Sequence, residues 1–170
     1  MDKNKKIIGR EVTVDFDNEI QNVPAKVDTG ADSSAVWASD IFVDEKHVLH
    51  FKLFGEDSPY YTGQEHTTKE FKVAMTKSSL GETQLKYRVK LPITIADRKI
   101  RASFGLSDRS THTYPILIGR RTLSGKFIVD VSQTKNLLKI EKNTSPGLNK
   151  EMQKNPYKFY KEQYLKGGQK

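Results

Sequence analysis

Val27-Asp28-Thr29-Gly30-Ala31-Asp32-Ser33-Ser34 is the stretch that decides the fold, and it follows a run, residues 23–27, that predicts a strand. A strand that leads into Asp-Thr-Gly can present the Asp28 carboxylate at a turn. The Thr29 hydroxyl can then brace the loop, and Gly30 leaves room for close backbone approach. The plain alternative is an ordinary β-turn, because Asp and Gly are common turn residues. The rest of the chain must decide between the two.

A second stretch supports the functional interpretation. Residues 114–123, Tyr-Pro-Ile-Leu-Ile-Gly-Arg-Arg-Thr-Leu, predict a buried apolar strand that ends at Gly119-Arg120 and leads into a short helical turn. Together the two stretches resemble the retropepsin-like aspartic peptidases. Members of that superfamily carry Asp-Thr-Gly-Ala after one strand and an apolar-apolar-Gly-Arg segment near the C-terminus, with a flap hairpin between them. The resemblance covers roughly residues 7 to 133.

Within the superfamily, the chain looks like a bacterial and archaeal branch that is often labelled "ATP-dependent zinc protease". The similar segments are residues 25–38, 107–109, 114–120 and 127–132. Asp32 and Trp37 depart from that branch, much of which has a basic residue and a His at these places, and Asp32 is closer to the retroviral pattern. The branch often accompanies enzymes that add glutamate to proteins, so the resemblance points to an acidic substrate.

Alternation of polar and apolar residues predicts strands along most of the chain. The predicted strands are residues 11–16, 20–27, 48–54, 70–76, 85–95, 100–106, 127–131 and 137–140. Residues 33–40 are expected to form a loop, with Trp37 half in the core. Many short strands between turn residues indicate an all-β barrel or sandwich. The resemblance specifies the retropepsin-like closed β-barrel, the acid-protease fold.

The domain organisation follows from a change in composition after Glu141. We expect a peptidase domain over residues 7–141 and a basic C-terminal linker and helix over residues 142–170. Asn155-Pro156 favours a helix start. The tyrosines that follow share one helical face, which fits either a helix docked on the barrel or a mobile tail.

The net charge of +8 is concentrated in this tail, which holds nine lysines and three glutamates from Lys135 onward. Such a tail is more typical of a solvated arm than of a specific nucleic-acid reader, so nucleic acid is not an expected partner. No apolar run is long enough for a signal peptide or a membrane span, so no membrane contact is expected and a cytoplasmic protein is the default.

The chemistry that suits Asp28 is hydrolysis of a peptide bond by two carboxylates that share one proton. The sequence holds a single Asp-Thr-Gly, so the second carboxylate must come from another copy across a two-fold axis. We therefore predict a homodimeric aspartic endopeptidase that cleaves a peptide or protein. Asp28 is its acid and base, and Thr29, Gly30 and Ala31 support the loop.

Two further parts of the site are expected between and beside these motifs. Ser78, Ser79, Leu80 and Gly81 are expected at the tip of the flap hairpin. The resemblance to retroviral peptidases places Asp32 beside Arg120, where a guanidinium can make a two-pronged contact with a carboxylate near the dimer contact. Arg121 is expected to take no part in this pair.

Two alternatives remain open: a non-catalytic retropepsin-like binding module, and a metal-dependent peptidase as the branch label suggests. The sequence has no cysteine and no His-Glu-x-x-His, and its histidines (His47, His50, His66 and His112) are expected to be isolated surface residues. Residues 119–127 imitate a phosphate-binding loop, but with one residue too many between the glycines and Phe127 in place of Ser or Thr. No metal and no cofactor are therefore expected.

Overall fold

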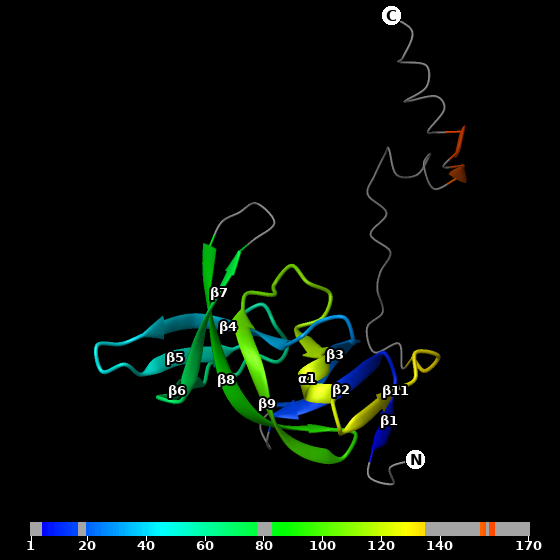
Figure 1. The fold of residues 1–170 in the computed structure, drawn as a ribbon. Helices are drawn as coiled ribbons and strands as arrows, with labels where there is room; N and C mark the ends of the chain where they lie inside the picture. The colour runs from blue at the N-terminus through cyan, green and yellow to red at the C-terminus, as the bar shows by residue number, and fades with distance from the viewer. Residues whose placement is uncertain (1–4, 17–19, 78–82, 135–153, 156, 159–170) are drawn as a thin grey trace, which may run out of the picture. The chain divides into compact units, whose positions relative to one another are not determined.

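The computed structural model describes residues 5–16, 20–77, 83–134, 154–155 and 157–158 of the chain (Figure 1). The chain divides into two compact units, Met1–Leu138 and Lys139–Lys170. Among the described residues, all the strands and the one helix with assigned bounds belong to the first unit. No helix in the described part has the length and hydrophobicity that crossing a membrane requires.

The described elements of the first unit are eleven strands and one short helix. In chain order they are β1 (Lys6–Ile8), β2 (Glu11–Phe16), β3 (Ile20–Asp28), β4 (Ser34–Val43), β5 (Leu49–Leu53), β6 (Glu65–Thr68), β7 (Phe71–Lys77), β8 (Thr83–Ile95), β9 (Arg98–Ser107), β10 (Ile116–Gly119), α1 (Arg120–Leu123) and β11 (Phe127–Val129).

Six of these strands close into a barrel in the order β10-β3-β2-β8-β9-β4, with β4 returning to β10. The β10–β3 and β4–β9 pairs are parallel, and the other pairs in the barrel are antiparallel. Closure leaves no free edge among the six strands. The predicted all-β, retropepsin-like barrel is thereby confirmed.

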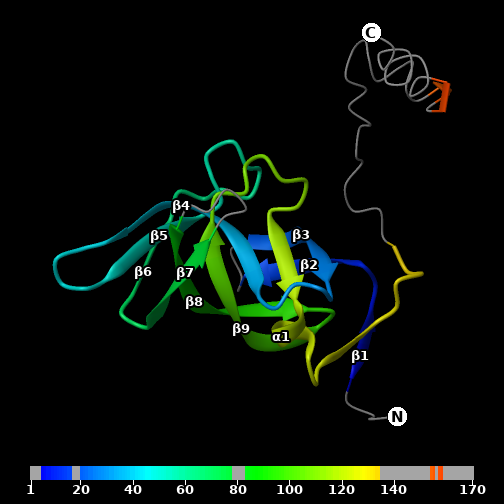
Figure 2. The same cartoon turned by 45° about the horizontal axis from the view of Figure 1, so that its top comes forward.

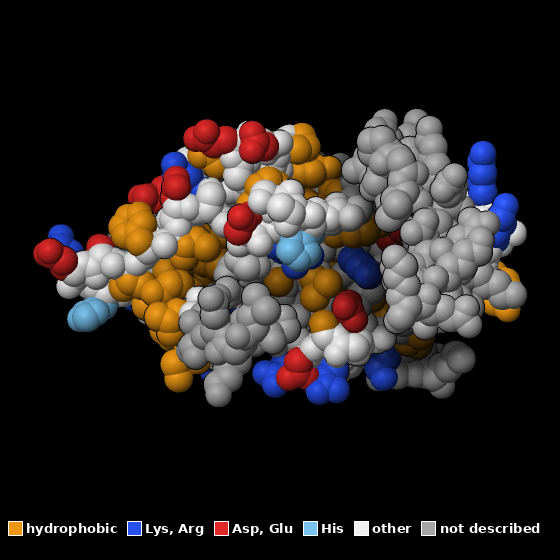
Figure 3. Space-filling view, turned by 90° about the horizontal axis from the view of Figure 1, so that it is seen from above, with side chains coloured by type: hydrophobic (Ala, Val, Ile, Leu, Met, Phe, Trp, Pro, Cys, Tyr) orange, Lys and Arg blue, Asp and Glu red, His pale blue; other side chains and the backbone are white. Residues whose placement is uncertain are grey.

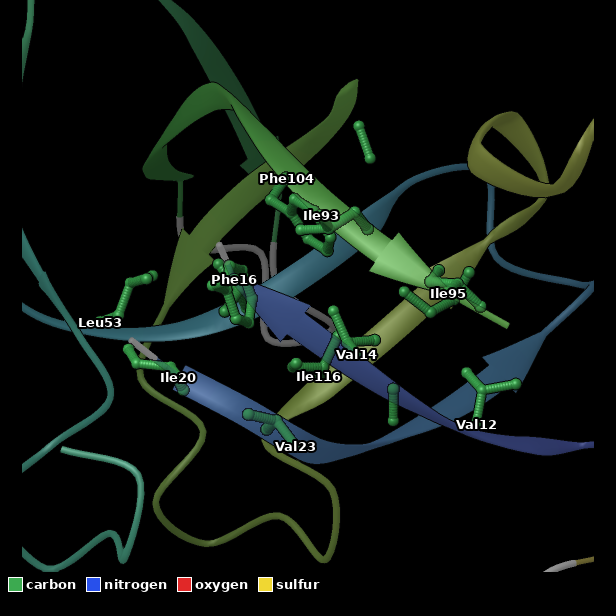
Figure 4. Close-up of a cluster of buried hydrophobic side chains, with 14 of the residues drawn as sticks. Val12, Val14, Phe16, Ile20, Val23, Leu53, Ile93, Ile95, Phe104 and Ile116 are labelled. Atoms are coloured by element: carbon green, nitrogen blue, oxygen red, sulfur yellow. The ribbon is translucent and has the colours of Figure 1, made fainter. Parts of the chain in front are cut away.

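The barrel core follows from the alternation that predicted the strands. On β2, for example, Val12, Val14 and Phe16 are buried and the residues between them are half-buried. Side chains from β2, β3, β5, β8, β9 and β10 converge on the same interior in Figure 4. Phe16 packs edge-on against Phe54, with ring centroids 6.0 Å apart. Each large apolar side chain buried in this way contributes about 1.5–3 kcal/mol.

One predicted loop is a strand. Residues 33–40 were expected to form a loop, but β4 begins at Ser34 and runs to Val43. The small residues of this stretch give a weak hydrophobic pattern, and it is pairing with the neighbours β9, β10 and β5 that makes a strand of it. Trp37 is half-buried as expected. It packs so closely on Gly55 that a Cβ there would lie 2.7 Å from the indole ring.

Two smaller elements extend from the barrel. β5 and β6 continue outward from β4 as an arm. β7 pairs with the first part of β8 as a hairpin, while the second part of β8 belongs to the barrel. The predicted apolar face of β8 is therefore divided between the barrel core and the hairpin. Val89, Ile93 and Ile95 are buried in the core, whereas Leu85 is 60% exposed on the hairpin.

Three predictions fall on residues outside the described part: the flap tip at Ser78, Ser79, Leu80 and Gly81, the strand 137–140, and most of the tail helix. At the start of that helix, Asn155 Oδ1 accepts a hydrogen bond of 3.0 Å from the backbone N–H of Lys158. This is the bond expected of an N-cap asparagine.

Candidate active site

Asp28 lies at the end of β3, beside a strand that comes from far along the chain. β10 lies between β3 and β4, parallel to the first and antiparallel to the second (Figure 2). In the β3–β10 register, Asp28 is the partner of Gly119. The structure therefore brings the two predicted stretches together, with the loop between β3 and β4 passing over the end of β10.

The loop holds the Asp28 carboxylate through backbone N–H groups. Asp28 Oδ1 accepts hydrogen bonds from the N–H of Gly30 at 3.0 Å and of Ala31 at 3.2 Å. A Cβ on Gly30 would lie 3.3 Å from the same oxygen, so a glycine allows this close turn. No described residue bonds to Asp28 Oδ2. Asp28 is only half-buried, so that oxygen is available to a further partner.

Thr29 does not brace this loop within one protomer. Its side chain is exposed, and within the described residues its hydroxyl makes no hydrogen bond. The expectation that Thr29 braces the loop is therefore not met in the single chain. There the backbone N–H groups of Gly30 and Ala31 hold the loop by their hydrogen bonds to Asp28. The exposed hydroxyl is available to a second molecule.

A buried polar network that the sequence did not predict fixes the loop to β10 and α1. The N–H of Gly119 donates to Ser34 Oγ at 3.0 Å, and Ser34 Oγ lies 2.7 Å from Thr122 Oγ1. Both hydroxyl residues are buried. A Cβ at position 119 would lie 2.5 Å from the carbonyl carbon of Ser33, so the backbones meet there without room for any side chain. The only sequence signal was the glycine before Arg120.

Asp32 lies between two arginines. Arg120 contacts Asp32 Oδ1 through Nε and Nη2, and Arg121 Nη2 donates to Asp32 Oδ2 at 2.8 Å. The hydrogen bond from Arg120 is the main reason that the pKa of Asp32 lies below its ordinary value. The structure thus brings Asp32 and Arg120 together, but Arg121, expected to be a bystander, shares the carboxylate. Removing either arginine alone leaves Asp32 a partner.

This charge cluster is exposed in the single chain: the side chains of Asp32, Arg120 and Arg121 are 45%, 67% and 69% exposed. Exposed ion pairs contribute little to stability because water and salt screen them. The loop is instead held to α1 by the N–H of Arg120, which donates to the carbonyl of Ala31 at 2.8 Å. The arginines therefore present an open charged surface next to the Asp28 loop.

The β7–β8 hairpin leads toward the predicted flap tip and carries an apolar face. Val73 pairs across the hairpin with Tyr87, and Met75 with Leu85. Val73, Met75 and Leu85 are 55%, 75% and 60% exposed. Hydrophobic side chains gather in the left half of the face drawn in Figure 3. Nothing in the described part of the protomer covers these residues, although apolar residues alternate with other residues along β7 and β8 as they do in a strand that faces a core.

Two histidines differ from the expectation of isolated surface residues. His50 Nε2 lies 3.2 Å from Asp44 Oδ2, and Nδ1 lies 3.4 Å from Glu65 Oε2. The ring also stacks on Phe42 at 4.6 Å. The hydrogen bond that the His50 ring donates to Asp44 raises the pKa of His50 above its ordinary value, although partial burial acts against it.

The other departure is His66, which stacks on Phe51 at 5.4 Å. His47 and His112 are exposed, as expected. No group of three or more His, Asp or Glu side chains in the described part of the chain could hold a metal ion.

Comparisons with known proteins agree with the fold. Residues 7–139 match the family model described as "RimB-like: Retropepsin-like aspartic endopeptidase RimB". The comparison with curated proteins finds no match. Among solved structures, the chain is similar to the crystal structure of Lpg0085, a protein of unknown function (DUF785) from Legionella pneumophila subsp. pneumophila str. Philadelphia 1. The TM-score is 0.55 at 21% identity, over 78% of this chain and 98% of that one, a likeness that shows the fold.

Proposed function

The chain belongs to the RimB-like family of retropepsin-like aspartic endopeptidases, and on that premise we propose that it hydrolyses peptide bonds with two Asp28 carboxylates, one from each protomer of a homodimer. The observation that carries the proposal is the state of Asp28 itself. Two backbone N–H groups hold one carboxylate oxygen, while the other has no partner in the described part of the chain. A catalytic carboxylate needs this combination of fixed orientation and open reach.

The proposed mechanism needs two such groups. Two carboxylates in hydrogen-bond reach cannot both ionise, so together they hold one proton. One carboxylate takes a proton from the attacking water while the other gives its proton to the carbonyl oxygen of the peptide bond. Because the sequence has one Asp-Thr-Gly, a monomer supplies half of this pair. The second half comes from another copy under a two-fold axis.

The surface around Asp28 suits this assembly. Thr29 and Gly30 are exposed next to the carboxylate, and Asp32 with its two arginines lies exposed at the end of the same loop. In the proposed dimer these groups face the second protomer. The apolar face of the β7–β8 hairpin then contacts the substrate, which is a peptide or protein and, as the resemblance implies, an acidic one.

Asp28→Asn tests the catalytic assignment. The amide keeps the shape of the side chain but cannot share the proton, so the rate of peptide cleavage is expected to fall by about 10²–10⁴-fold or more. The matched control is Asp97→Asn in the β8–β9 turn. Its side chain is 98% exposed, and asparagine tolerates its positive φ of 60°. Cleavage of an unfolded protein substrate is followed by mass spectrometry.

Two further measurements separate the alternatives. Sedimentation of the full chain is expected to show a dimer, and a chelator is expected to leave cleavage unchanged. Full activity in Asp28→Asn would reject the aspartic mechanism. Inhibition by chelator that zinc restores would favour a metal-dependent peptidase. A folded dimer that cleaves nothing would favour the binding module.

A further inference from the structure

β7, β8 and β9 lie side by side as one antiparallel sheet (Figure 1), and the outer face of this sheet is rich in cations. Side chains alternate between the two faces of a strand, so the positions next to buried Val89 and Ala102 point away from the core. None of the three strands contains an acidic residue. The outward positions form a basic face that consists of Lys72, Lys86, Arg88, Lys90, Lys99 and Arg101.

Two grooves run along the basic face, with volumes of about 580 Å³ and 650 Å³. Ile100 and Arg101 line both, so the two grooves are continuous. Glu70 lines the first and Asp15 the second, and Asp28 lines neither. The basic face is therefore separate from the candidate active site. The cations that line the grooves are Lys72, Arg88, Lys90, Arg101, Arg121 and Lys126 in the first, and Lys99 and Arg101 in the second.

The cations of the basic face are poorly neutralised within the protomer. In the part of the chain that the structure describes, its lysines form no ion pair, and Arg101 approaches only the carboxylate of Glu70, at 3.9 Å. Lys72 and Arg88 are direct cross-strand partners. Like charges at such positions destabilise a sheet. A row of cations that costs stability in this way points to an anionic ligand that neutralises it.

The spacing of these cations suits the phosphates of a nucleic acid. Arg88 and Lys90 are two residues apart on an extended strand, so their Cα atoms are separated by about 6.6 Å, which is close to the distance between successive phosphates of one strand. From Arg88 to Thr94, which pairs with Lys99, the row extends about 20 Å along β8. That length corresponds to about six base pairs at 3.4 Å each. The hydroxyls of Thr94 and Ser103, on the same face, can donate to phosphate oxygens.

A duplex suits the basic face better than a single strand does. Proteins commonly hold single strands by stacking the bases on aromatic side chains. Phe71, the aromatic residue that lines the first groove, packs edge-on against Tyr87 with ring centroids 5.8 Å apart. Duplexes can be bound through their phosphates alone, without contacts to the bases. We propose that the basic face binds the sugar–phosphate backbone of a nucleic-acid duplex without regard to sequence, a function that goes beyond peptide hydrolysis and does not need Asp28.

The basic face changes the expectation about nucleic acid. From the sequence, nucleic acid is not an expected partner, because the residues before Lys135 carry a net charge of only +2. Strand pairing collects six of their cations on one face, so the local charge is far more positive than the sum along the chain. Because salt screens charges beyond about 8 Å, the local charge decides whether a polyanion binds there.

Binding is measured by fluorescence anisotropy on the full-length Asp28→Asn protein, so that a peptide competitor stays intact. The probes are labelled RNA and DNA duplexes of about twelve base pairs, twice the length of the basic face. Both are expected to bind, with an affinity that falls as the salt concentration rises. Adding Lys90→Gln and Lys99→Gln, at two exposed positions, should weaken binding at least about tenfold. It should also reduce the slope of log K against log salt by about 1.8 for the DNA duplex.

The matched control adds Lys26→Gln and Lys46→Gln, which remove the same charge from exposed positions outside both grooves. This control keeps the basic tail and is expected to bind like the parent protein. Both pairs of substitutions change exposed side chains, so neither should lower the melting temperature, and a loss of binding cannot be ascribed to unfolding. Equal binding by the two double variants would show that net charge alone attracts the duplex, and would overturn the site.

Three other results would also overturn it: failure of both duplexes to bind, tighter binding of a single strand than of the duplex, or displacement of the duplex by a glutamate-rich peptide at a lower concentration than by unlabelled duplex. These outcomes are independent of catalysis. If Asp28→Asn retained peptidase activity, the proposed function would fail while the binding data stood. If the Lys90 and Lys99 variant bound normally, the peptidase proposal would stand.

Discussion

The Asp28 loop and the β7–β8 hairpin, two regions proposed to close on one substrate, are built in opposite ways. The loop is fixed by backbone contacts and buried hydroxyls around Gly119, Ser34 and Thr122. The hairpin lies outside the barrel and leaves apolar residues exposed. A catalytic acid or base must be held within a fraction of an ångström, whereas a cover over the substrate must be able to move. Stability is thus concentrated at the loop, and substitutions in the two regions should separate stability from activity.

The largest effect is expected from Gly119→Ala. Its Cβ would meet the Ser33 backbone at 2.5 Å, and backbone cannot rotate away, so the free energy of unfolding should fall by at least about 3 kcal/mol. Gly125→Ala is the control, because it has a positive φ of 72° but no atom within 4 Å of the new Cβ. It should cost about 1–2 kcal/mol. Urea denaturation of both variants measures the difference. Equal losses would mean that the close approach at Gly119 does not hold the loop.

Ser34→Ala should have the next largest effect. It leaves the buried N–H of Gly119 and the hydroxyl of Thr122 without their partner, which costs about 1–3 kcal/mol. Thr122→Val removes the other hydroxyl, and the double variant should lose less than the sum of the two single losses, since the hydroxyls share one bond. A double-mutant cycle in urea denaturation measures this coupling. Additive losses would show that the two hydroxyls act independently.

A smaller, pH-dependent effect on the free energy of unfolding is expected in the arm formed by β4, β5 and β6, which lies outside both regions. The hydrogen bond to Asp44 is the main reason that the pKa of His50 is raised, and the pKa of Asp44 is lowered mainly by the backbone N–H of Val48 and further by His50. The His50 contribution is complete below its unfolded pKa of about 6.5 and is lost as the pH rises through the folded value. The Asp44 contribution is present above about pH 3.9 and is lost as the pH falls through its folded value.

The stability lost in His50→Gln should therefore be greatest near pH 5 and shrink toward pH 8. Urea denaturation at the two pH values tests this. His47→Gln, at an exposed histidine in the same arm, serves as the control for replacing a histidine in this region. A pH-independent loss in His50→Gln would show that stacking on Phe42, and not the charge, holds the ring.

The smallest effect on stability is expected in the hairpin. Met75→Ser and Leu85→Ser change exposed side chains, so the free energy of unfolding should stay within about 0.5 kcal/mol. Cleavage by the proposed enzyme should nevertheless fall, because the apolar contact with substrate is lost. Lys86→Gln on the opposite face of the same strand is the control and should alter neither quantity. A large loss of stability in Met75→Ser would show that the hairpin is as strongly held as the loop.

The sequence predicted the parts of the fold and site that depend on local pattern. Alternation located β2, β3, β8 and β9, and Asp-Thr-Gly with Gly119-Arg120 located the candidate site. It could not predict β4, whose small residues form a strand because β9, β10 and β5 pair with it. Nor could it pair Glu65 with His50, because those residues meet only through the β5–β6 register.

A basic groove lined by Lys72, Arg88, Lys90, Arg101, Arg121 and Lys126 is a stronger example of what a linear sequence cannot show. Its cations come from β7, β8, β9 and the α1–β11 segment, so no window of sequence shows them together. Summed along the chain, these residues looked like an ordinary balanced surface. The double contact of Asp32 was missed as well, since the resemblance pointed to Arg120 alone, yet both arginines reach the carboxylate.

The position of β10 also sets an order of events in folding. β2 and β3 are close in sequence and can pair as a hairpin early, but β10 pairs with β3 only after the chain as far as Gly119 has been made. Until then Asp28 lacks the strand, the glycine and the buried hydroxyl contact that hold its loop. Partly synthesised or partly folded chains are therefore expected to lack an ordered Asp28, and the proposed catalytic group would be assembled only when nearly the whole barrel has formed.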